Sequence, residues 1–172
     1  MQFAKDSFYI TLRERLAALN PQRVVLINGV TRPAIIVAEN EVVVPVEPLP
    51  DTFYIEWGAA KVANRQDGSR LLMGMDCTIS HHTLGTVESG VDRGRTLATL
   101  DTELISICQP RQTSKRDYSQ APSVDLGTNI VWTTPDLGEV SGVIAQEPSN
   151  KRVRLERKAR LTVFFFPEVI FQ

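Results

Sequence analysis

The segment from Val153 to Phe166 alternates between apolar and polar residues along almost its whole length. Its apolar parity carries Val153, Leu155, Ala159, Leu161, Val163 and Phe165. Its other parity carries Arg154, Glu156, Lys158, Arg160 and Thr162. Because successive side chains of a strand point to opposite faces of a sheet, this period of two predicts a long β-strand with one buried face. Arg157 alone breaks the apolar set, and Phe164 and Phe166 make the far end apolar on both faces, as in a strand covered on two sides.

Two segments have the spacing of amphipathic helices. The first is predicted from about Asp6 to Leu19, and its apolar face carries Phe8, Leu12, Leu16 and Leu19. The second is predicted to begin near Asp92, a candidate cap, and to stop before Pro110. Its apolar face carries Leu97, Leu100, Leu104 and Ile107.

Two β-hairpins are also predicted. In the first, Arg23 to Ile27 and Val30 to Val37 flank Asn28-Gly29, the pair typical of a type I′ turn because both turn residues need positive φ. Pro33 should lie at the edge or end of its strand, since proline cannot donate to the ladder. In the second, an aromatic strand from Phe53 to Trp57 is followed by a polar turn and a strand from Arg70 to His82.

The remaining segments lack a clear period. Glu39 to Pro50 contains three prolines and is predicted to be an extended surface connection. Arg111 to Thr128 is predicted to be a polar stretch without regular structure, Asn129 to Thr133 a short strand, and Pro135 to Asn150 a loop. Together these elements predict one α+β domain over residues 1–172, in which two helices pack on a mainly antiparallel sheet.

Composition narrows the class of protein. A formal net charge of −1 gives no global reason to expect nucleic-acid binding. No stretch has the roughly 18 apolar residues of a membrane span, and the N-terminus lacks the apolar core of a signal peptide, so we expect a cytoplasmic chain without membrane contact. In that compartment Cys77 and Cys108 are expected to be reduced, buried thiols.

The charges are unevenly distributed along the chain. Five acidic residues and no basic one lie between Ala38 and Gly58, whereas six basic residues and only Glu156 lie between Lys151 and Arg160. This segregation predicts two surfaces of opposite sign. The residues that we single out from these segments are Glu39, Glu41, Glu47, Glu56, Arg154, Lys158 and Arg160. Solvated surface charge on a monomer is the competing interpretation.

No catalytic, cofactor or metal constellation is recognisable in the sequence. His81 and His82 are adjacent and should point to opposite faces of a strand, which disfavours a shared metal. Gly85 and Gly90 have the spacing of a phosphate-binding loop, but its lysine is missing. Two alternatives stay open: a binding module whose aromatic strand from Phe53 to Trp57 lines a ligand pocket, and a hydrolase that uses Cys108 or a pair of carboxylates.

The order of the elements resembles that of the tail terminator or tail completion proteins of tailed bacteriophages. Local sequence supports the resemblance at Lys115-Arg116-Asp117-Tyr118 and at Ala159-Arg160-Leu161-Thr162-Val163. In that family an N-terminal helix precedes a sheet, a second helix packs across the sheet, and the final strand completes it. The connection from Glu39 to Pro50 and the loop from Pro135 to Asn150 depart from the family plan.

The resemblance implies a non-enzymatic structural protein of a phage or prophage-derived tail. It implies a ring of identical subunits, commonly six, that terminates the tail tube and joins it to the head. The implied partners are further copies of the chain, tail-tube proteins and head-completion proteins, and the implied location is a virion or tail-like particle assembled in the cytoplasm. The acidic and basic segments would then meet between neighbouring subunits.

Overall fold

A computed structural model describes residues 1–41, 48–64, 71–85, 91–144 and 153–168 of the chain. The helices are α1 (Gln2–Leu19), α2 (Ala38–Glu41) and α3 (Asp92–Ile107). The strands are β1 (Val24–Ile27), β2 (Val30–Pro33), β3 (Ile35–Val37), β4 (Phe53–Asn64), β5 (Leu72–Thr83), β6 (Gln112–Asp117), β7 (Val124–Trp132), β8 (Asp136–Leu137), β9 (Ser141–Ile144) and β10 (Val153–Phe165). The fold is α+β, as predicted.

The last strand, β10, lies in the middle of an eight-stranded sheet with the order β3-β4-β5-β10-β7-β6. It pairs antiparallel with β5 from Leu155 to Phe165, and its other edge pairs in turn with β9, β8 and β7. The predicted alternation is confirmed, because Ala159, Leu161, Val163 and Phe165 are all buried.

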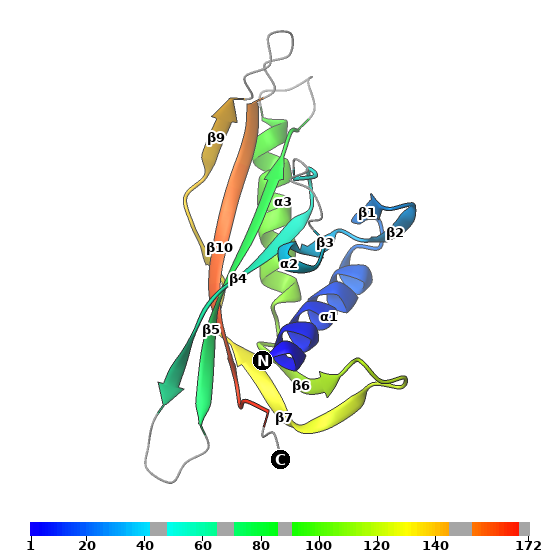
Figure 1. Cartoon of the computed structure of the whole chain (residues 1–172). Coiled ribbons are helices and arrows are strands. Elements are labelled where there is room, and N and C mark those ends of the chain that lie inside the picture. The colour runs from blue at the N-terminus through cyan, green and yellow to red at the C-terminus, as the bar shows by residue number, and fades with distance from the viewer. Residues whose placement is uncertain (42–47, 65–70, 86–90, 145–152, 169–172) are drawn as a thin grey trace.

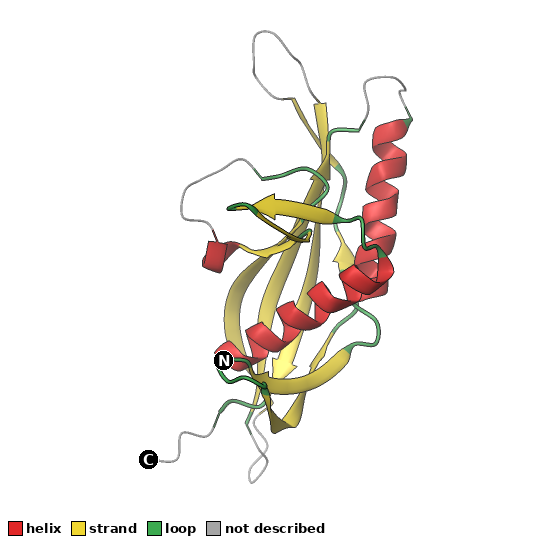
Figure 2. Cartoon of the chain, turned by 90° about the vertical axis from the view of Figure 1, so that its right-hand side faces the viewer, coloured by secondary structure: helices red, strands yellow, loops and turns green. Residues whose placement is uncertain are grey.

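Both long helices lie on one side of this sheet (Figures 1 and 2). The apolar face predicted for α3 is confirmed, since its four predicted residues are buried. In α1, Phe8, Leu12 and Leu16 are buried as predicted, but Leu19 is half exposed because it is the last residue of the helix. The helix also begins earlier than predicted, at Gln2, because Ala4 continues the buried face.

Arg15 joins the two long helices. Its guanidinium donates to the carbonyl oxygens of Ile107 at 3.0 Å, Pro110 at 2.8 Å and Gln112 at 3.1 Å, and it lies 5.5 Å from the centroid of the Trp132 ring. A cation at this place satisfies the carbonyl groups that the end of a helix leaves unpaired.

The first hairpin forms a separate two-stranded sheet of β1 and β2. Asn28 and Gly29 have φ values of 50° and 78°, as the predicted turn requires. The second strand was predicted to continue to Val37, and this is wrong. The strand ends at Pro33, and β3 then joins the large sheet by parallel pairing with β4.

The second hairpin is confirmed, since β4 and β5 pair antiparallel. Its aromatic strand has Phe53 and Ile55 fully buried and Trp57 half-buried. The strand is longer than predicted, because β4 runs on through small residues to Asn64.

Three sequence interpretations need correction. The stretch from Arg111 to Thr128, predicted to lack regular structure, contains β6 and half of β7. The strands were missed because this stretch packs through hydroxyl contacts instead of aliphatic side chains. The Arg116 N–H donates to Ser7 Oγ at 2.9 Å, and the hydroxyl oxygens of Thr11 and Thr113 lie 3.1 Å apart. The loop from Pro135 to Asn150 contains β8 and β9, which pair with β10. The connection after β3 opens with the short helix α2, and residues 42–47 lie outside the described residues.

The core between the helices and the sheet generates a stability prediction. Leu104 is fully buried in α3, whereas its neighbour Ile105 is exposed. Leu104→Ala should lower the free energy of unfolding by about 2–5 kcal/mol, since it leaves a cavity in the core. Ile105→Ala is the matched control and should change it by about 0.5 kcal/mol. Urea denaturation measures both, and equal effects would contradict the assigned face of α3.

Candidate functional site

The face of the sheet opposite the helices carries most of the charged residues that the sequence singles out. Glu56 on β4 and Arg160 on β10 are both registered with Thr78 on β5, and Arg160 is also registered with Asp136 on β8. Residues in register across a sheet share a face. They therefore form one row, with Glu56 and Arg160 separated by the width of two strand spacings, about 10 Å.

Glu56 and Arg160 are exposed, and within the described residues neither has an ion-pair partner. They lie on one face, so the prediction of separate acidic and basic surfaces is wrong for this pair. The residues nevertheless remain free to interact with charges outside the chain.

Arg154 and Lys158 lie on the same face of β10 as Arg160, as the alternation predicts. Between them stands Glu156, whose carboxylate lies 3.2 Å from Arg154 and 3.9 Å from Lys158. Exposed pairs of this kind stabilise a fold by about 0–1 kcal/mol. The basic row is therefore partly neutralised by its own strand.

The structure does not bring the predicted acidic residues together. Glu39 binds the Lys5 ammonium at 2.8 Å and 2.9 Å, which places its carboxylate against α1. The side chain of Glu41 and the whole of Glu47 lie outside the described residues. Of the acidic set, Glu56 is the described member on the open face of the sheet.

A buried polar network connects α3 to the sheet. His81 Nε2 lies 2.8 Å from Asp101 Oδ1, and Arg157 Nε lies 3.1 Å from Asp101 Oδ2. Arg157 also donates from Nη1 to the carbonyl oxygen of Gly138 at 2.6 Å. Arg157 is the residue that interrupts the apolar parity of β10, so the interruption was the sequence signal for a polar contact beneath α3. His81 and Asp101 were missed as a pair because nothing in the sequence places α3 over β5.

The pKa of His81 is lowered from its ordinary value, chiefly because burial disfavours the charged imidazolium. The hydrogen bond and the charge of Asp101 act in the opposite direction, Arg157 lowers the pKa further, and Glu156 raises it. His81 Nδ1 has no hydrogen-bond partner among the described residues. The network therefore favours a neutral imidazole held by a carboxylate that Arg157 already shares.

The thiols do not form a reactive site. Cys77 and Cys108 are free and buried, as predicted. Burial raises the pKa of Cys108 to about 12, so the nucleophilic thiolate is scarce at neutral pH. Among the described residues no group of three His, Cys, Asp or Glu side chains could hold a metal ion.

The aromatic strand points into the core and not into a ligand pocket. Phe53 is fully buried, and its ring lies edge-on to His81 at 5.4 Å. Trp57 packs edge-on against Phe8 at 5.5 Å. These contacts support packing as the role of the strand.

No helix in the described part of the chain is long and apolar enough to cross a membrane.

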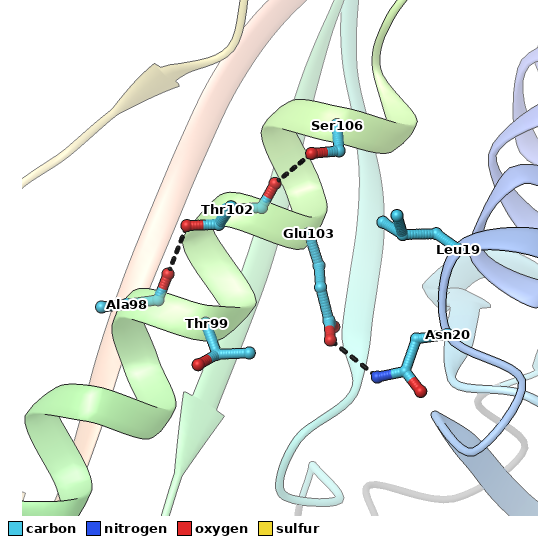
Figure 3. Close-up of a pocket in the computed structure, with 7 residues that line it drawn as sticks. All are labelled: Leu19, Asn20, Ala98, Thr99, Thr102, Glu103 and Ser106. Atoms are coloured by element: carbon cyan, nitrogen blue, oxygen red, sulfur yellow. Dashed lines mark hydrogen bonds between the residues drawn. The ribbon is translucent and has the colours of Figure 1, made fainter.

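A groove that the sequence did not indicate lies between the end of α1 and α3 (Figure 3). It has a volume of about 450 Å³, and its lining residues are Leu19, Asn20, Ala98, Thr99, Thr102, Glu103 and Ser106. At its floor Glu103 accepts hydrogen bonds from Asn20 at 2.7 Å and from Arg23 at 2.9 Å and 3.1 Å. The Glu103 carboxylate is thus hydrogen-bonded to the segment that leads into β1.

The His81 network generates a pH prediction. Because the folded pKa lies below the unfolded value of about 6.5, the unfolded chain binds the extra proton first as the pH falls. The free energy of unfolding should therefore be highest above about pH 6.5 and decrease as the pH falls toward the folded pKa. His81→Gln should flatten this decrease, measured by urea denaturation between about pH 7 and 5.5.

His82→Gln is the matched control for this experiment, because His82 neighbours His81 on β5 but points to the other face. This variant should keep the contribution of His81 to the slope. An unchanged slope in His81→Gln would contradict the role assigned to His81.

No protein-family model matches the chain, and no curated protein matches it. Among solved structures, the chain is similar to a chain from "Virion of native gene transfer agent (GTA) particle", with 17% sequence identity, a TM-score of 0.38, and coverage of 93% of this chain and 92% of that chain. A TM-score of this size marks a distant likeness, and neither fold nor function is inferred from it.

Proposed function

We propose that the protein is a non-enzymatic structural component of a phage or prophage-derived tail, which forms a ring that terminates the tail tube and joins it to the head. The observation that carries the proposal is the order of elements in space. An N-terminal helix precedes the sheet, α3 packs on the same face, and β10 completes the sheet from its centre. This is the plan that the sequence resemblance implies.

The distribution of side chains supports a role in assembly. The buried polar groups of α3, Asp101 and Glu103, are occupied by contacts within the chain. The thiols are buried, and the aromatic strand belongs to the core. Three surfaces of the described residues are available to a partner: the face of the long sheet opposite the helices, the projecting β1–β2 hairpin (Figure 1) and the groove beside α3.

We assign the open face of the sheet to contact between subunits, with Glu56 of one copy meeting Arg160 of the next. Arg154 and Lys158 extend the same face toward the start of β10, and we assign them to the rim of this contact. Opposite charges of this kind select the correct neighbour and speed its approach more than they add affinity. The contact should weaken as salt increases, because exposed charges are screened over about 8–10 Å at physiological ionic strength.

The ring itself is tested by assembly. Purified protein, alone and mixed with a purified phage tail-tube protein, is followed by size-exclusion chromatography with light scattering and by negative-stain electron microscopy. The expected result is closed rings, free or at one end of the tubes. A monomer that neither assembles nor binds tubes at high protein concentration would contradict the proposal.

The charge contact is tested by reversal. Glu56→Arg or Arg160→Glu should each weaken ring formation by about tenfold at low salt, since like charges then meet between copies. The double variant Glu56→Arg/Arg160→Glu restores opposite charges across the contact and should recover assembly. Glu14→Arg is the control, because Glu14 lies on α1, on the helical side of the sheet, and is exposed but has no assigned role. If the double variant does not recover assembly, the pairing of Glu56 with Arg160 is refuted, but the proposal that the protein forms a ring is not.

A further inference from the structure

We propose that the β1–β2 hairpin of one copy docks in the groove between α1 and α3 of the neighbouring copy, so that hairpin and groove form the apolar contact of the assembly. The inference rests on the ring proposed above and adds a contact that the charged residues do not provide. The occupant of the groove is a second copy of this chain.

The hairpin exposes aliphatic side chains that no described part of its own chain covers. Val24 and Leu26 lie on its outward face, where Leu26 is 66% and Val24 47% exposed. Val30, at the turn, is 61% exposed. The opposite face of the hairpin is the one that packs on the body, through Val25 and Ile27. Exposed aliphatic residues gathered on one projecting element mark an interaction surface.

The groove has a matching surface without free charge. Thr99, Thr102 and Ser106 each donate their hydroxyl to the carbonyl oxygen four residues earlier in α3, at 2.8–3.0 Å. Their polar groups are thereby satisfied within the helix, and their carbon atoms line the groove beside Ala98. Leu19, which is 50% exposed, forms the opposite wall (Figure 3).

The polar groups that line the groove already have hydrogen-bond partners within the chain. Glu103 accepts three hydrogen bonds from Asn20 and Arg23, and small-molecule sites ordinarily rely on a few convergent polar groups that remain available. An apolar protein segment therefore fits the groove better than a charged or polar ligand. The chain itself carries such a segment in β1.

The positions of the hairpin and the groove favour contacts that link each copy to the next one along the assembly. Figure 2 shows the hairpin pointing away from α3, so that its turn does not reach the helix that lines the groove. A hairpin that cannot fill its own groove can fill that of a neighbour, and the neighbour's hairpin then remains free for the next copy. Head-to-tail contacts of this kind generate rings when the rotation closes.

Cysteine cross-linking tests the contact directly. Leu26→Cys and Thr102→Cys, combined in one chain, place a thiol on the hairpin and one in the groove. Mild oxidation should join the hairpin of one copy to the groove of the next and produce a ladder of disulfide-linked species that ends at the ring. The native Cys77 and Cys108 are buried and should not compete.

The single variants are the controls. A mixture of Leu26→Cys protein with Thr102→Cys protein should give linked dimers and no ladder, because each copy then carries one introduced thiol. Each single variant alone should stay unlinked. Linked dimers from Leu26→Cys alone would mean that hairpins meet each other, which overturns the docking in the groove.

A second variant separates this inference from the proposed function. Leu26→Ser removes an exposed side chain and should leave folding unchanged, but it should raise the protein concentration needed for half-assembly by about tenfold or more. Val62→Ser, at an exposed position on β4, is the matched control and should assemble as the unmodified chain does. The docking alone is overturned if Leu26→Ser forms rings as well as the unmodified chain does and the Leu26→Cys/Thr102→Cys variant forms rings without cross-linking. The absence of rings from the unmodified chain overturns the ring and the docking together.

Discussion

The antiparallel pairing of β10 with β5 is the interaction on which the rest of the structure depends. It joins the last strand of the chain to the second hairpin over eleven registered residue pairs, and β7, β8 and β9 are attached to the sheet through the other edge of β10. Its buried parity forms the floor on which both helices pack. The chain therefore cannot complete its core until its C-terminal segment has been inserted into the middle of the sheet, a non-local step that slows the folding of β-rich proteins.

The charged residues of α3 explain how the helix is fixed to neighbouring elements while its other side stays exposed. Asp101 turns toward His81 and Arg157 on the sheet, and Glu103 turns toward Asn20 and Arg23. Buried carboxylates are tolerated only when paired, so each fixes its neighbouring element in place. The same pairing leaves the exposed side of α3 from Ala98 to Ser106 without free charge, which is why a helix so polar in composition can border an apolar groove.

Alternation and helical spacing predicted β10, both hairpins and both long helices, because in each the buried residues are aliphatic or aromatic. β6 was missed for the opposite reason: it packs on α1 through Ser7, Thr11 and Thr113, whose hydroxyl groups look like loop residues in a sequence. Of the predicted charged residues, Glu56, Arg154, Lys158 and Arg160 lie on predicted strands, whereas Glu39 lies on the short helix α2. Glu56 and Arg160 share one face of the sheet instead of forming two separate surfaces. Which charges meet depends on register and on internal partners, such as Lys5 for Glu39, and neither follows from order along the chain.

The two-stranded sheet of β1 and β2 has a consequence for the dynamics of the protein. Within the described parts of the chain it shares no ladder with the large sheet, and it rests on a satellite cluster whose buried members are Val25, Ala34 and Ile36. A two-stranded unit of this size has little stability of its own, so its amide protons should exchange with solvent through local opening, at a lower free energy than those of β5 and β10. Amide exchange in the hairpin can therefore be used to follow assembly. Exchange that slows in β1 and β2, while it stays unchanged in the large sheet, would show that a neighbouring copy has bound the hairpin.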